Sequence, residues 1–185
     1  MKKLLGCCAA ALMAGCATAP MDDMGNDGGG AMLTSRAPAP APIVEGQSVP
    51  VTVAEDQQAL LESDDPQLEA NKRLVYDWWR EVLSAGHLEN NADYQAEDYI
   101  QHNPLVPTGR APFEAFFGSR PPREIPDTID NLVTIVAEDD LVVFVFKREL
   151  PHPRNEGETY TTTWFDMMRV EDGKVAEHWD YGTLR

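Results

Sequence analysis

The chain has little cysteine, and none beyond its first segment. Its three cysteines, Cys7, Cys8 and Cys16, all lie within the first sixteen of 185 residues. The remainder therefore has no disulfide, no thiol nucleophile and no cysteine-ligated metal site. It also has no internal repeat, no glycine-rich phosphate loop and no serine or threonine in a nucleophile-elbow context. A nucleotide-binding or serine-hydrolase motif is thereby excluded.

Basic side chains are also scarce. The chain carries 15 lysines and arginines against 31 acidic residues, a formal net charge of −16, and it has no basic run. A duplex or an anionic bilayer would repel such a surface, so nucleic-acid binding is not expected. We expect the acidity to serve solubility.

The first sixteen residues, "MKKLLGCCAAALMAGC", are typical of a bacterial export signal. Lys2 and Lys3 precede an apolar stretch over 4–14 that is too short to span a bilayer as a helix. The ending "LMAGC" resembles a lipobox, which predicts cleavage before Cys16 and lipidation of that residue. The chain would then be held in the bacterial cell envelope, on the periplasmic side. The alternative is an ordinary secretory signal cut near the same position.

The composition of residues 17–66 predicts a disordered tether. "MDDMGNDGGGAM" is flexible and acidic, and "RAPAPAPIVEG" is rich in proline and alanine. Neither segment buries enough apolar area to offset the entropy of ordering, and 54–62 is expected to form at most a loose helical turn. The folded domain is predicted over 67–185, which is long enough for one core.

The domain begins with a helical pattern and continues with strands. Asp64 or Asp65 is placed to cap a helix that starts at Pro66, has apolar residues at helical spacing and ends at Gly86. A short helix is expected within 88–99, and another within 109–122 places Phe113, Phe116 and Phe117 on one side. Two β-rich runs joined at "EDD" follow over 128–150, and two more strands are expected over 159–170 and 174–181. This order predicts an α+β domain with helices on one face of an antiparallel sheet.

The turn "VEDGK" leaves two registers open for the last hairpin. A three-residue loop, 171–173, with a bulge pairs Val170 with Lys174 and sets Asp166 opposite His178. A two-residue Asp172-Gly173 turn pairs Val170 with Val175 and moves Asp166 to the other face. We favour the first register because the turn residues suit it.

Two groups of residues are candidates for chemistry. His178 and Asp180 share a sheet face in either register, and Asp166 joins them in the favoured one. A carboxyl group in an apolar pocket has a raised pKa and becomes a usable acid or base, with an imidazole to assist it. The alternative is structural, with Asp166 and His178 as satisfied partners. The second group is "YIQHNP" (99–104), where His102 and Asn103 alternatively form a capping turn.

"YIQHNP", the helix after it and "WFDMMRVEDGKVAEHWD" resemble the SnoaL-like branch of the nuclear-transport-factor-like superfamily, over residues 68–181. The resemblance implies a cystatin-like or SnoaL-like cone, in which a curved antiparallel sheet and about three N-terminal helices enclose a pocket. Members are often homodimers through the outer sheet face. In polyketide-cyclase members a pocket aspartate is the acid/base, without cofactor or metal. Asp180 matches it by position, with His102, Asp166 and His178 as pocket neighbours.

The resemblance and the residues together predict a pocket for a small apolar molecule. Tyr99, Asn103, Trp164 and Phe116 are expected to contact it. No spacing resembles a metal motif, so no metal or other cofactor is expected. The leading hypothesis is an acid/base isomerase, aldol-type cyclase, hydrolase or dehydratase acting on a carbonyl compound. The alternatives are a non-catalytic ligand-binding envelope lipoprotein and a structural dimer with a filled cone.

Overall fold

The computed structural model describes residues 49–183. The predicted signal segment with Cys16 and residues 17–48 of the predicted tether lie outside this range. Within 49–183, no helix is long and apolar enough to cross a bilayer.

The first helix, α1 (Pro66–Trp78), continues directly into a π-helical turn, Trp79–Ser84. Asp65 caps it as predicted, because its carboxylate accepts a hydrogen bond from the backbone N–H of Gln67 at 2.8 Å. The predicted end at Gly86 is also confirmed, since this glycine takes a positive φ of 81°. The π-helical turn inserts an extra residue, which keeps the neighbouring Trp78 and Trp79 both against the sheet side of the domain.

Three short helical segments follow along the chain. They are a 3-10 turn at Leu88–Asn90, α2 (Asn91–Tyr94) and α3 (Arg110–Phe117). The predicted short helix within 88–99 is therefore correct only as far as Tyr94. From Gln95 the backbone pairs with the last strand and forms β1 (Gln95–Gln101), because a neighbouring strand satisfies its polar groups better than an isolated turn of helix.

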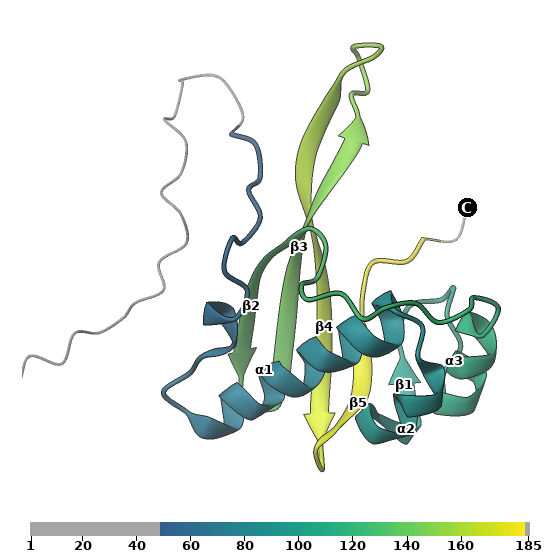
Figure 1. Cartoon of the computed structure of the whole chain (residues 1–185). Helices are drawn as coiled ribbons and strands as arrows, with labels where there is room; N and C mark the ends of the chain where they lie inside the picture. The colour runs from purple at the N-terminus through teal and green to yellow at the C-terminus, as the bar shows by residue number, and fades with distance from the viewer. Residues whose placement is uncertain (1–48, 184–185) are drawn as a thin grey trace, which may run out of the picture. The chain divides into compact units, whose positions relative to one another are not determined.

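The sheet contains five strands in the order β1-β5-β4-β3-β2. β2 (Leu132–Glu138), β3 (Leu141–Pro151), β4 (Thr159–Glu171) and β5 (Lys174–Trp179) are consecutive and antiparallel, whereas β1 runs parallel to β5. The helices lie on one side of this curved sheet, and the ends of β3 and β4 project beyond it as a long hairpin (Figure 1). The predicted α+β class is confirmed.

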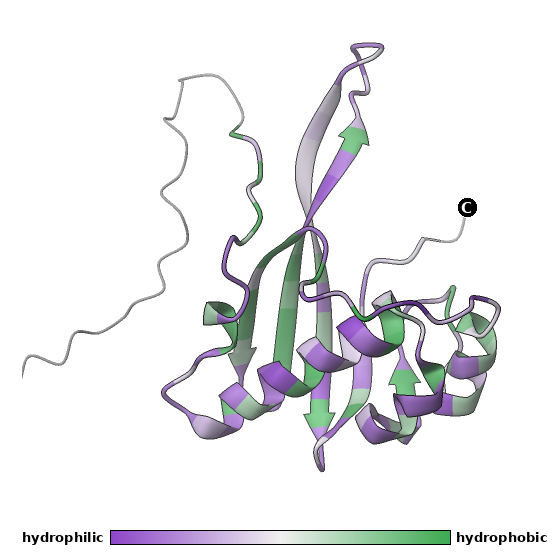
Figure 2. Cartoon of the chain, viewed as in Figure 1, coloured by the Kyte–Doolittle hydropathy of each residue, from purple (hydrophilic) through white to green (hydrophobic). Residues whose placement is uncertain are grey.

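The core lies between the helices and the inner face of the sheet. On β3, Val142, Phe144 and Phe146 alternate inward and are buried, and the part of β3 behind α1 is largely green, the colour of hydrophobic residues, in Figure 2. The register places Phe144 opposite Asp166 on β4. A carboxyl group is therefore set among apolar side chains on the inner face.

Residues 54–62 pack against the domain and contain a 3-10 turn at Ala59–Leu61, so the helical turn is present but the prediction of a disordered tether is wrong for this segment. Leu61 is 2% exposed within the core. The side chain of Gln57 is also buried, and its amide oxygen accepts hydrogen bonds from the backbone N–H of Ile129 and the hydroxyl of Tyr76, at 2.8 and 2.9 Å. One apolar and one polar anchor thus offset the entropy of ordering the segment.

The last hairpin has the two-residue turn, so the favoured three-residue loop is wrong. Asp172 and Gly173 both have positive φ, 50° and 69°, and Val170 pairs with Val175. A bulge at Ala176 then shifts the register, so that Met168, and not Asp166, is opposite His178. The extra residue restores the predicted alternation of faces, and Asp166, His178 and Asp180 come together on the inner side.

Candidate active site

Three ionisable side chains meet where β4 and β5 run beside each other. Asp166, His178 and Asp180 each place a polar side-chain atom within 4.8 Å of the others. Asp166 is 4% exposed and His178 is 6% exposed, while Asp180 is half-buried directly after β5. The predicted gathering of these three residues is thus present in the structure.

Gln101, at the end of β1, is a site residue that the sequence analysis missed. The parallel pairing of β1 with β5 sets Gln101 beside His178. Its amide oxygen accepts from the backbone N–H of Asn103 at 2.9 Å, which fixes the orientation of the amide. Its Nε2 therefore donates, to the Tyr99 hydroxyl at 2.9 Å and to Nδ1 of His178 at 3.0 Å. Once β1 is known, the alternation of Tyr99 and Gln101 on one face would have revealed it.

This hydrogen-bond pattern assigns the tautomer of His178. Because Gln101 donates to Nδ1, that nitrogen is an acceptor and the ring proton is on Nε2. Nε2 then donates to Oδ1 of Asp166 at 3.2 Å. The imidazole is thus held from both sides, which orients the Asp166 carboxyl toward the cavity.

Asp180 is held through one oxygen only. Its Oδ2 accepts from Nδ2 of Asn103 at 3.0 Å, and Asn103 is itself oriented by the backbone N–H of Leu105 at 2.9 Å. Oδ1 of Asp180 is buried and receives no donor from residues 49–183. Gly182 lets the backbone pass close to the side chain of Asn103, since a Cβ atom at Gly182 would collide with Oδ1 of Asn103. Asn103, which the sequence analysis expects to contact the ligand, thus holds the carboxylate of Asp180 in this structure.

Burial controls the protonation of the groups around Asp180. It raises the pKa of the Asp166 carboxyl above its ordinary value, although the hydrogen bond from His178 opposes the shift. It also raises the pKa of the Tyr99 hydroxyl, and the charges of Asp180 and Asp166 raise it further. Tyr99 therefore stays protonated. One carboxyl of the pair is biased toward its acid form.

The three groups open onto a cavity of about 250 Å³ between the helices and the sheet. The cavity shows that the cone is not completely filled, which excludes the filled-cone alternative. Eleven side chains line it: Trp78, Trp79, Leu83, Ser84, Gln101, Val106, Phe113, Phe117, Asp166, His178 and Asp180. Both tryptophans of α1 and its π-helical turn thus face the ligand space.

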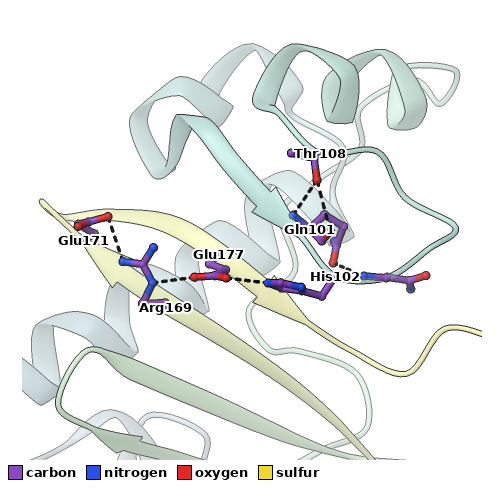
Figure 3. A network of polar contacts seen from close by, with 7 residues as sticks. Gln101, His102, Thr108, Arg169, Glu171 and Glu177 are labelled. Atoms are coloured by element: carbon purple, nitrogen blue, oxygen red, sulfur yellow. Dashed lines mark hydrogen bonds and ion pairs between the residues drawn. The ribbon is translucent and has the colours of Figure 1, made fainter.

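His102 does not lie in this pocket, and its predicted place there is wrong. Its Nε2 bonds Oε1 of Glu177 at 2.6 Å, and its ring stacks on Trp179 with centroids 4.9 Å apart. Figure 3 shows the resulting network on the outer side, in which Arg169 bonds Glu177 from the other end at 2.9 Å. The reason is strand alternation, since Gln101 points inward and the next residue must point outward.

The other predicted contact residues fall into different places. Tyr99 is fully buried and reaches the site only through Gln101. Trp164 lines a neighbouring cavity of about 350 Å³, where the Arg148 guanidinium lies 4.3 Å from its ring centroid. Phe116 is 52% exposed, because Phe113 and Phe117, four residues apart, take the inner face of α3.

The arrangement of the three ionisable side chains also determines whether they can bind a metal ion. Asp166, His178 and Asp180 are close enough to share a cation. Nε2 of His178, however, carries the proton donated to Asp166, and a metal requires a free lone pair on that nitrogen. Binding would thus require the imidazole to change its tautomer and lose the bond from Gln101. An open groove of about 650 Å³ near Asp65 and Asp139 has no histidine or aromatic lining residue, and it is not a candidate site.

The fold and the site together define an α+β cone with a carboxyl pair at the polar end of an aromatic cavity. The sequence model of the SnoaL-like domain matches residues 75–178. The chain belongs to the SnoaL-like domain family. No curated protein matches the sequence.

Several solved structures are similar to the chain. A candidate polyketide cyclase from Acidithiobacillus ferrooxidans shares 18% identity over 65% of this chain and 90% of that chain, with a TM-score of 0.43. A second candidate polyketide cyclase, from Xanthomonas campestris, shares 21% identity over 62% and 91%, with a TM-score of 0.43. An NTF2-like protein from Anabaena variabilis shares 18% identity over 67% and 94%, with a TM-score of 0.45.

Proposed function

We propose that the chain is a cofactor-independent acid/base enzyme acting on a small, largely apolar carbonyl compound. The observation that carries the proposal is the buried Oδ1 of Asp180, which has no donor among residues 49–183 and lies beside the Asp166 carboxyl in an aromatic-lined cavity. Two carboxyl groups in different environments can divide the roles of acid and base between them. The membership of the SnoaL-like family is consistent with this chemistry.

The geometry suggests one role for each group. Oδ1 of Asp180 takes a proton from the carbon next to the carbonyl, and Asp166 in its acid form donates a hydrogen bond or proton to the carbonyl oxygen. His178 holds Asp166 in position. The proton on Asp180 then returns to the same or another carbon, which gives exchange, isomerisation or, with a second carbonyl, aldol-type closure.

Hydrogen–deuterium exchange next to a carbonyl tests the proposal without knowledge of the natural substrate. A panel of one-ring ketones is incubated with the protein in heavy water, and exchange at carbon is followed by NMR. We expect acceleration by the wild-type protein and a loss of about 10²–10⁴-fold in the Asp180→Asn variant. Asp98→Asn, an exposed site with the same charge change, is the matched control.

Two results would contradict the proposal: no acceleration with any ketone, or full exchange in Asp180→Asn. Saturable ligand binding without exchange would instead support the non-catalytic ligand-binding lipoprotein. In that case Asp180→Asn is expected to change affinity only modestly.

We also propose that the domain is exported, anchored in the envelope through a lipid on Cys16, and paired as a homodimer through the outer sheet face. The lipobox-like sequence supports the anchor. Apolar side chains on the outer face support the pairing, because Val136 and Phe165 are 55% and 56% exposed there.

A further inference from the structure

The ionisable lining of the cavity consists mainly of carboxyl groups. Asp180 and Asp166 are the carboxyl groups, with Asp166 biased toward its acid form by burial, and the described lining includes no lysine or arginine. Arg148, a cation farther along β3, lies over Trp164 and lines the adjoining cavity instead. The cavity therefore has a negative potential that favours a positively charged ligand and disfavours an anion.

Aromatic rings form much of the remaining wall. Trp78 and Trp79 meet edge to face, with centroids 6.3 Å apart and planes at 86°, and Phe113 lies 6.2 Å from Trp78. Trp78 is fixed in place because its indole N–H donates to Asn91 at 3.0 Å, away from the cavity. The electron-rich ring faces attract an organic cation and add to the effect of the carboxyl groups.

One atom in the site lacks the partner that such a ligand would provide. Oδ1 of Asp180 is buried and has no donor among the described residues, while Oδ2 is bonded to Asn103. An ammonium or a protonated ring nitrogen is a donor with a positive charge, so it satisfies Oδ1 by a charge-assisted hydrogen bond. The size of the cavity, about 250 Å³, can be compared with the ~150 Å³ cavity that binds benzene. It fits one ring with a short substituent.

We infer that this cavity takes small one-ring compounds with a basic nitrogen, with the protonated nitrogen at Asp180 and the ring among Trp78, Trp79 and Phe113. The inference deepens the proposed function and rests on it for the identity of the substrate. That substrate would be a ketone with an amino substituent or with a nitrogen-containing ring. The binding preference itself requires no turnover.

Three matched probes test the preference: benzylamine, benzyl alcohol and benzoate, titrated into the full chain near neutral pH and followed through the indole N–H signals of Trp78 and Trp79. We expect benzylamine to bind about tenfold more tightly than benzyl alcohol. Benzoate should show no saturable shift. Asp180→Asn should reduce benzylamine binding to the level of benzyl alcohol, whereas Asp98→Asn should leave it unchanged.

Several outcomes would overturn the inference. They are benzoate binding as tightly as benzylamine, no binding of benzylamine, or benzylamine binding that survives in Asp180→Asn. The wild-type ranking of the three probes decides the question even if the Asp180 variant does not fold. Failure here leaves the exchange test with neutral ketones intact, so the ligand class and the acid/base function are judged separately.

Discussion

Replacing Gln101 by leucine tests how the imidazole of His178 is held. The wild-type amide makes three hydrogen bonds, to Tyr99, His178 and the backbone of Asn103. Leucine has a similar size, so it removes these bonds without opening a large cavity. Nδ1 of His178, the hydroxyl of Tyr99 and the N–H of Asn103 then lose these partners.

The expected cost in stability follows from those three groups. A buried polar group left without a partner costs about 1–3 kcal/mol, and the N–H of Asn103 is only partly buried, so we expect a total loss of about 2–4 kcal/mol. Urea unfolding of Gln101→Leu and wild-type protein measures this difference. A loss below about 0.5 kcal/mol, typical of a neutral surface substitution, would refute the reasoning.

The tautomer provides a second, independent readout. Nitrogen-15 NMR of the imidazole should show the ring proton of His178 on Nε2 in the wild-type protein. Gln101→Glu places an acceptor at Nδ1 and should convert the ring to the doubly protonated form. A wild-type proton on Nδ1 would show that the assigned orientation of Gln101 is wrong.

Three further predictions concern stability, assembly and the anchor. A carboxyl whose pKa is raised by folding stabilises the fold below its unfolded value of about 3.9, and this contribution is lost as pH rises through the folded value. The stability of Asp166→Asn relative to wild type should thus increase from about pH 4 to neutrality in urea unfolding; a constant difference contradicts the shift. Light scattering should show that Phe165→Asp converts a dimer to a monomer, and an unchanged dimer would contradict pairing through the outer sheet face. Mass spectrometry of envelope-derived protein should find diacylated Cys16 at the N-terminus, and an unmodified N-terminus would contradict the anchor.

The sequence predicted those parts of the fold that depend on local chemistry. Asp65, Pro66 and Gly86 mark the ends of the first helix by capping and backbone preference, and the structure confirms them. The π-helical turn after Trp78 leaves no comparable local signal. Its effect, two neighbouring tryptophans both facing the cavity, became visible only with the structure.

The site required tertiary information at two points. The bulge at Ala176 compensates for the two-residue turn, so Asp166 reached the expected face by an unexpected register. The parallel pairing of β1 with β5 joins segments about 80 residues apart, and it decides that Gln101 points inward and His102 outward. A motif such as "YIQHNP" identifies the segment but does not give the facing of each side chain without that strand partner.

A carbon-13 NMR titration of the aspartate side chains in the ligand-free protein tests most directly whether the two carboxyl groups of the site differ. The central claim is that two adjacent carboxyl groups have different environments, with Asp166 biased toward its acid form by burial. We predict that Asp166 titrates at clearly higher pH than the ordinary aspartate value of about 3.9. Titration of Asp166 at or below that ordinary value would contradict the predicted effect of burial on its carboxyl group.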